Sequence, residues 1–114
     1  MVHATIKMVM PAKEEREVLK MLRSIAERTR VEEGCMGCFV YQSAEGRSTL
    51  LVEEFWKTEK DLDSHLRSDE YQQLLLLVEM SLELPEIRFN VISHTTGLET
   101  IEKARNFIPE GERS

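Results

Sequence analysis

Apolar and polar residues alternate along the first ten positions, which is the two-residue period of a β-strand with one buried face. Pro11 ends this predicted strand, because proline cannot donate to a hydrogen-bonded ladder. After it the period becomes that of an amphipathic helix, with Val18, Leu22 and Ile25 on one stripe and charged residues opposite. Gly34 is a natural end for this helix.

Two further strands are predicted at residues 36–43 and 49–56, both rich in apolar, aromatic and β-branched residues. The short segment between them contains Gly46 and is typical of a hairpin loop. A last strand is predicted at residues 87–95, and Gly97 opens a short tail helix. The chain therefore contains four predicted strands.

The segment after the third strand predicts a helix that turns an imidazole inward. Thr58 is the expected N-cap, and its side chain can accept a hydrogen bond from the backbone amide of Asp61. His65 falls among leucines on one face of this helix. Ser68, followed by two acidic residues, is a second start signal, so we expect the helix to break there before it resumes through residue 78.

The element order β-α-β-β-α-β with a tail helix predicts an α+β, ferredoxin-like domain whose helices lie on one face of an antiparallel sheet. Residues 1–105 would form this single domain and residues 106–114 a C-terminal tail. Both faces of the sheet carry apolar residues, and the helices can cover only one of them. We therefore expect the other face to pack against a second copy, giving a homodimer.

Composition narrows the range of partners. The chain has 114 residues and a formal net charge of −6, and it has no basic cluster. Binding to nucleic acid or to an anionic membrane needs a positive field, so neither is expected. The N-terminus has no basic segment followed by an apolar one, and the longest apolar run, residues 74–78, is too short to span a bilayer. A cytoplasmic location is the expectation.

Cys35 and Cys38 form a C-x-x-C pair, which can indicate a redox or metal site. A redox pair normally opens a helix, whereas this pair leads into a predicted strand. A structural zinc would need two more ligands, and neither His3 nor His94 has a suitable partner. We interpret the cysteines as small buried residues and the two histidines as surface or pocket-rim residues, and we expect no metal site.

Several short motifs resemble the antibiotic biosynthesis monooxygenase (ABM) family over nearly the whole chain. They are Glu33-Gly34-Cys35 before the second strand, Tyr41 on it, Glu54-Phe55-Trp56 at the end of the third, and Asp61-Leu62-Asp63-Ser64-His65-Leu66 with Ser68 afterwards. The resemblance implies a ferredoxin-like domain that dimerises into an α/β barrel. Similar domains oxidise phenols or quinols, isomerise a phosphorylated sugar, degrade haem or have no known activity, so fold is implied more specifically than reaction.

The resemblance implies a monooxygenase that oxidises a small aromatic or quinol-like substrate with O2 and needs no cofactor. Such a site requires an apolar cavity, a base that titrates near neutrality and donors for the substrate oxygens. His65 is the candidate base, and Glu54 could orient it if both lie on the helix-covered face. Trp56, Tyr41 and Tyr71 are the candidate substrate-binding residues.

Two other functions remain open. His65 could serve as the proton shuttle of an isomerase acting on a small carbonyl compound, with Lys7 and Arg88 as the sheet cations available for a phosphorylated substrate. Alternatively the protein is a non-catalytic ligand-binding dimer, which would be favoured if leucine and methionine side chains, such as Met8, fill the cavity. Haem is disfavoured, because Leu75 stands near the position where the haem-degrading branch has its proximal histidine.

Overall fold

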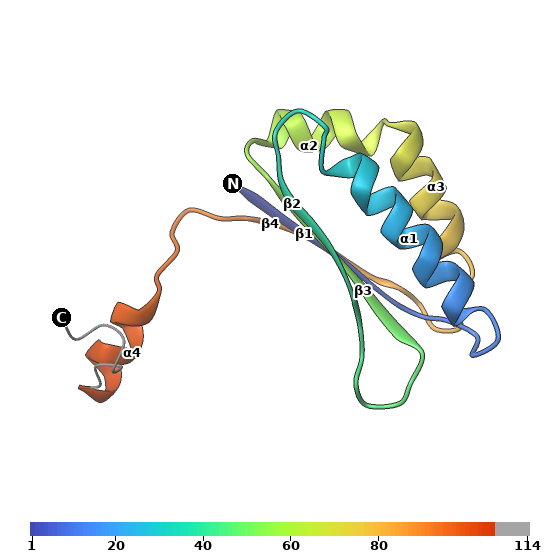
Figure 1. The fold of residues 1–114 in the computed structure, drawn as a ribbon. Helices are drawn as coiled ribbons and strands as arrows, with labels where there is room; N and C mark the ends of the chain where they lie inside the picture. The colour runs from blue at the N-terminus through green and yellow to red at the C-terminus, as the bar shows by residue number, and fades with distance from the viewer. Residues whose placement is uncertain (107–114) are drawn as a thin grey trace.

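The computed structural model describes residues 1–106. The strands are β1 (Val2–Val9), β2 (Cys35–Gln42), β3 (Thr49–Trp56) and β4 (Glu86–Val91), and the helices are α1 (Glu15–Thr29), α2 (Glu59–Leu66), α3 (Asp69–Val78) and α4 (Leu98–Arg105). This is the predicted order, including the break between α2 and α3 (Figure 1). The predicted tail, residues 106–114, lies outside the described residues except for its first residue.

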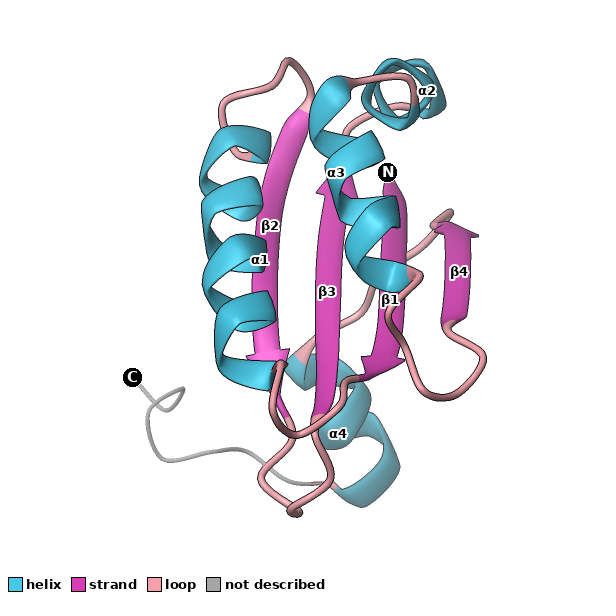
Figure 2. Cartoon of the chain, turned by 90° about the vertical axis from the view of Figure 1, so that its right-hand side faces the viewer, coloured by secondary structure: helices cyan, strands magenta, loops and turns pink. Residues whose placement is uncertain are grey.

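The four strands form one antiparallel sheet in the order β2-β3-β1-β4. Helices α1, α2 and α3 lie together on one face of it, as Figures 1 and 2 show from two directions. This arrangement confirms the predicted ferredoxin-like α+β fold. None of the helices in residues 1–106 is long and apolar enough to cross a membrane.

The core lies between the sheet and the three helices. Alternate residues of β1 face the helices, and each is at most 5% exposed. Ile6 and Met8 pack with the apolar stripe of α1 and with α3 in one cluster, whose buried members are Ile6, Met8, Met10, Val18, Leu22, Ile25, Ala26, Cys38, Leu50, Val52, Tyr71, Leu74, Leu77 and Val78. Val2 packs with Trp56 and Leu62 in a second, smaller cluster. Burying one such aliphatic side chain stabilises the fold by about 1.5–3 kcal/mol. The predicted strand alternation and helix stripe are therefore confirmed.

Two side-chain caps separate α2 from α3. The Thr58 hydroxyl accepts a hydrogen bond from the Asp61 amide at 3.1 Å, and the Ser68 hydroxyl accepts one from the Tyr71 amide at 3.1 Å. Ser68 also donates to the carbonyl oxygen of His65 at 2.6 Å. Both predicted start signals are thus confirmed, and the second fixes the last turn of α2, which carries His65.

Strand β4 is shorter than the sequence predicts, because it ends at Val91 rather than near residue 95. The reason is the length of its neighbour: β1 begins at Val2, and the last contact of the ladder is the Ile92 amide with the Met1 carbonyl at 2.8 Å. Beyond this point the chain has no strand to pair with. It leads to α4, which stands apart from the sheet on the open side and buries none of its residues (Figure 1).

Gly34 and Gly46 provide a matched test of the backbone. Both have positive φ, +82° and +79°, but an added Cβ at Gly34 would overlap the side chain of Asp61, whereas nothing lies within 4 Å of one at Gly46. We expect Gly46→Ala to cost about 1–2 kcal/mol for the left-handed backbone alone. Gly34→Ala should lower the free energy of unfolding by more, because α2, which carries Asp61, must also shift. Urea denaturation of both variants measures the difference, and equal losses would contradict the packing described.

Candidate active site

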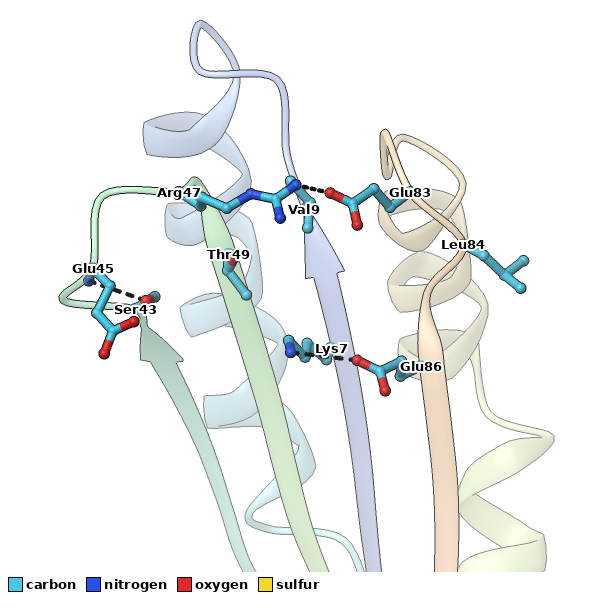
Figure 3. Close-up of a pocket in the computed structure, with 9 residues that line it drawn as sticks. All are labelled: Lys7, Val9, Ser43, Glu45, Arg47, Thr49, Glu83, Leu84 and Glu86. Carbon is cyan, nitrogen blue, oxygen red and sulfur yellow. Dashed lines mark hydrogen bonds and ion pairs between the residues drawn. The ribbon is translucent and has the colours of Figure 1, made fainter.

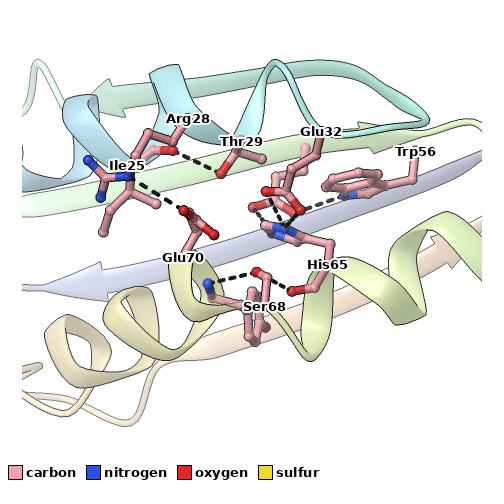
Figure 4. Close-up of polar contacts among 10 residues, drawn as sticks. Ile25, Arg28, Thr29, Glu32, Trp56, His65, Ser68 and Glu70 are labelled. Carbon is pink, nitrogen blue, oxygen red and sulfur yellow. Dashed lines mark hydrogen bonds and ion pairs between the residues drawn. The ribbon is translucent and has the colours of Figure 1, made fainter.

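The imidazole of His65 is the centre of a buried polar cluster between α2 and β3. The residue is 1% exposed. Its Nδ1 lies 3.0 and 3.1 Å from the two carboxylate oxygens of Glu32, and its Nε2 lies 3.2 Å from Oε2 of Glu54 (Figure 4). Both ring nitrogens therefore face a carboxylate.

Glu54 and Trp56 reach this cluster from β3. The period of the strand places both on the helix-covered face, as the prediction for Glu54 required, and they are 4% and 0% exposed. The Trp56 indole N–H donates to Oε1 of Glu54 at 2.9 Å. Each oxygen of Glu54 thus has a hydrogen-bond partner, which is what a buried carboxylate requires.

Aromatic rings enclose the imidazole. Trp56 stacks on it with ring centroids 4.5 Å apart and an angle of 29° between the planes. Tyr71 from α3 meets it edge-on at 5.2 Å and 76°. The structure therefore brings together four of the five predicted site residues, which are His65, Glu54, Trp56 and Tyr71. We expected Trp56 to stack on a substrate ring, and here it stacks on the imidazole.

The two carboxylates favour the charged form of the imidazole. Burial of the ring lowers the pKa of His65, but the hydrogen bonds and negative charges of Glu54 and Glu32 outweigh it, so the pKa is raised above 6.5. Geometry supports the same conclusion, since a neutral imidazole carries one N–H and cannot donate to both carboxylates. Burial, with the charge of Glu54, also raises the pKa of Tyr71, which keeps its hydroxyl protonated.

Tyr41, the fifth predicted site residue, lies on the opposite face of the sheet from His65. It pairs with Leu51 in the β2–β3 ladder, is 47% exposed, and donates its hydroxyl to Oε1 of Glu53 at 3.1 Å. Its position follows from the strand period, because Cys38 faces the helices and Tyr41 is an odd number of residues away. The sheet therefore separates Tyr41 from the imidazole.

Glu32 is the site residue that the sequence analysis missed. It lies in the loop between α1 and β2, where no hydrophobic period applies, and it meets a residue 33 positions further along the chain. Only the path of the loop brings the two together. No signal in the sequence distinguishes this glutamate from the neighbouring Glu33.

A second pair of a histidine and a glutamate lies on the open face of the sheet. His3 lies 2.8 Å from Oε2 of Glu53 and stacks on Phe55 with centroids 4.7 Å apart. Its side chain is 24% exposed, which agrees with the predicted surface or rim position. His94 follows β4 and is exposed, as predicted.

The space beneath the helices is filled. Met8, Met10, Leu22, Leu50 and Leu74 are each at most 1% exposed and pack in the same core. Five hollows stand out on the surface of residues 1–106, and none of them is lined by His65, Glu54 or Trp56. The site is therefore closed in this conformation.

A hollow at the C-terminal end of β1 and the start of β3 is lined by residues that form ion pairs. Arg47 pairs with Glu83, and Lys7 lies 3.4 Å from Glu86 (Figure 3). Arg88, the other sheet cation, also pairs with Glu86, at 3.4 Å. Lys7 and Arg88 therefore share one carboxylate, and both lie on the open face of the sheet, opposite to His65.

The cysteines are poor nucleophiles. Cys38 is 1% exposed, and burial raises the pKa of its thiol to about 12. Burial also raises the pKa of Cys35, which lies half-buried at the start of β2. These positions agree with small buried residues at a strand start. Within residues 1–106 no three side chains of His, Cys, Asp or Glu are placed to hold a metal ion.

The fold and the site together define a ferredoxin-like domain with a buried imidazole–carboxylate cluster between sheet and helices. The family model for antibiotic biosynthesis monooxygenase matches residues 1–75. The chain therefore belongs to the antibiotic biosynthesis monooxygenase family. The matched residues include all the members of the cluster around His65. No curated protein matches the chain.

Solved structures agree with this fold. A conserved protein from Methanosarcina mazei Go1 is 32% identical, with a TM-score of 0.71 over 78% of this chain and 89% of its own. Rv0793 from Mycobacterium tuberculosis is 25% identical, with a TM-score of 0.69 over 85% and 100%. A protein from Deinococcus radiodurans, described as an antibiotic biosynthesis monooxygenase, has a TM-score of 0.78 over 86% of this chain and 98% of its own. At 19% identity it supports the fold alone.

The raised pKa of His65 predicts how stability depends on pH. The stabilisation from a group whose pKa is raised in the folded state is complete below the unfolded value of 6.5, and it is lost as the pH rises through the folded value. We expect the free energy of unfolding to fall from weakly acid to weakly alkaline pH, and this slope to be smaller in His65→Gln. Urea denaturation across this range measures it, with His94→Gln as the control. An identical slope in His65→Gln would contradict the charged imidazole.

Proposed function

We propose that this protein is a cofactor-independent monooxygenase that oxidises a small phenol or quinol with O2. The observation that carries the proposal is the buried His65, held at its ring nitrogens by Glu32 and Glu54 within a fold shared with antibiotic biosynthesis monooxygenases. Deprotonation of an electron-rich phenol or quinol would allow it to give an electron to O2 directly.

Each residue around His65 has a separate role in this proposal. Glu54 holds the Nε2–H of His65, so an imidazole that has given up its Nδ1 proton keeps this tautomer and accepts the proton of the substrate hydroxyl at Nδ1. Trp56 holds the plane of the imidazole by stacking and orients Glu54 through its indole N–H. Tyr71, which stays protonated, is the available donor for a substrate oxygen.

The reaction balances without an external reductant. A phenol with a free ring carbon and O2 give a quinone and water, and a quinol and O2 give a hydroxyquinone and water. In both cases one oxygen atom of O2 becomes bonded to a ring carbon and the other leaves as water. The protein then has to supply only a base, a donor and an apolar environment.

One observation favours a second candidate function, a dimer that binds a ligand without turnover. Leucine and methionine side chains fill the core between sheet and helices, and the His65 side chain has no exposed area, so a substrate has no preformed access to it. The isomerase has less support, because Lys7 and Arg88 lie on the open face of the sheet and His65 lies on the helix-covered face.

Oxygen uptake by metal-stripped protein tests the proposal, over a panel of phenols and hydroquinones with autoxidation controls. We expect uptake above the uncatalysed rate, reduced at least about 10²-fold in His65→Gln, because the substrate would lose its proton acceptor. His94→Gln should keep the activity, since this residue lies outside the cluster. Wild-type uptake no faster than autoxidation with every compound would leave the ligand-binding dimer as the better explanation.

We also propose that two copies associate through the open face of the sheet. Phe39 and Tyr41 are 42% and 47% exposed there, next to Phe55, and a contiguous aromatic patch on a small domain is typical of an interface. Helices α1, α2 and α3 cover the other face, and α4 stands apart on the open side without burying any of its residues (Figure 1). A stable interface would bury roughly 800 Å² on each copy.

Sedimentation of two phenylalanine variants tests this association. We expect the wild type to sediment as a dimer and Phe39→Lys to shift it towards monomer, because a charge would be buried at the interface. Phe89→Lys is the matched control, since Phe89 is 46% exposed but pairs with Ala4, whose side chain faces the helices. Equal effects of the two substitutions would contradict an interface on the open face.

A further inference from the structure

The closed site raises the question of how a substrate reaches His65. The imidazole side chain has no exposed area, and both of its nitrogens are occupied by carboxylates. A substrate hydroxyl can gain a ring nitrogen only if one carboxylate leaves. The two carboxylates, Glu32 and Glu54, differ in exposure and in how firmly they are held.

Glu54 is held in place on all sides. Its side chain is 5% exposed, it lies in the middle of the sheet, and its second oxygen accepts the indole N–H of Trp56 at 2.9 Å. Moving it would leave a buried donor without a partner and a buried charge without compensation. Glu54 is therefore the fixed partner of the imidazole.

Apart from its contacts with His65, Glu32 is held at its backbone. Its amide donates to the carbonyl of Thr29 at 3.0 Å, and its carbonyl accepts from the amide of Cys35 at 3.1 Å. Its side chain is 24% exposed, and within residues 1–106 the hydrogen bonds of its carboxylate go to His65. The carboxylate can therefore turn outward to water by side-chain rotation, while the loop keeps its path.

We propose that Glu32 is a gate residue, whose carboxylate occupies the position that the acidic hydroxyl of the substrate takes at Nδ1 of His65. The inference rests on the proposed function, since it assigns the atom at which the substrate binds. The ligand class it selects is a flat molecule with a weakly acidic hydroxyl, a phenol or an enol. Such a group can replace a carboxylate as the hydrogen-bond partner of the imidazole.

The exchange would also prepare the base. In the closed site the imidazolium donates from Nδ1 to Glu32, so Nδ1 has no free lone pair. Glu32 takes this proton as it turns outward and releases it to water, which leaves a neutral imidazole with Nε2–H on Glu54. Nδ1 can then accept the proton of the substrate hydroxyl. Opening the site and creating the base are thereby one event.

The other groups packed around the ring do not replace Glu32. Glu54 faces Nε2 from β3, Tyr71 meets the ring edge from α3 and stays protonated, and Cys38 on β2 is a buried thiol. Loss of the Glu32 charge therefore removes one of the two negative groups that hold the imidazole in its charged form.

Variants of Glu32 test the gate without any turnover. We expect Glu32→Ala to bind the chromophoric probe 4-nitrophenol about tenfold more tightly than the wild type, because no carboxylate has to be displaced. Glu32→Gln should lower the pKa of His65 as followed by imidazole NMR signals. Glu33→Gln is the matched control, since it removes the same charge one residue away at an exposed position, and it should change neither quantity.

Glu32→Asp protects the test against a variant that does not fold. It keeps the charge but shortens the side chain, so it should also bind the probe more tightly than the wild type. Equal or weaker probe binding by both Glu32→Ala and Glu32→Asp would overturn the gate, as would probe binding that leaves the His65 signals unmoved.

Kinetics separates this inference from the proposed function. With a substrate that is turned over, Glu32→Ala should lower KM and shift the acid limb of the pH profile, whereas Glu33→Gln should do neither. Oxygen uptake that depends on His65 but is indifferent to Glu32 would overturn the gate and keep the oxygenase. Tighter probe binding by Glu32→Ala without oxygen uptake from any compound would support the gate and overturn the oxygenase.

Discussion

The structure of this site depends on one constraint, which is that a buried imidazole can carry a charge only if carboxylates surround it. A cation removed from water costs several kcal/mol unless it is paired and hydrogen-bonded. Glu54 and Glu32 supply the pairing, each from a different part of the chain. The charge of His65 thereby ties α2 to the sheet and to the loop after α1, in addition to the apolar contacts of Leu62 with Val2 and Trp56.

The same constraint explains why the site is closed. Water near the ring would weaken its attraction to both carboxylates, and the aromatic rings of Trp56 and Tyr71 exclude it. A small domain also cannot afford an empty cavity, since each unfilled volume loses packing energy. Methionine and leucine side chains therefore fill the interior, and Met8 and Met10 are the members that could most readily adapt to a ligand.

Much of this architecture could be predicted from the sequence, because it follows from periods and caps. The alternation of β3 placed Glu54 on the face of His65, and Thr58 and Ser68 marked both helix starts. The same alternation, applied to β2, places Tyr41 on the face of the sheet opposite to His65. Glu32 and the filled interior could not be predicted, because loop paths and side-chain volumes have no period.

The two faces of β3 show why similar residues need not do similar chemistry. Glu53 and Phe55 point to the open face and meet His3, while Glu54 and Trp56 point inward and meet His65. The outer pair is 24% and 22% exposed, so solvent screens it and its geometry is weakly enforced. The inner pair lies in a low dielectric, where a carboxylate fixes both the orientation and the charge of the ring. Burial, rather than the identity of the residues, therefore distinguishes His65 from His3, and Glu32 is the more exposed of its two carboxylate partners.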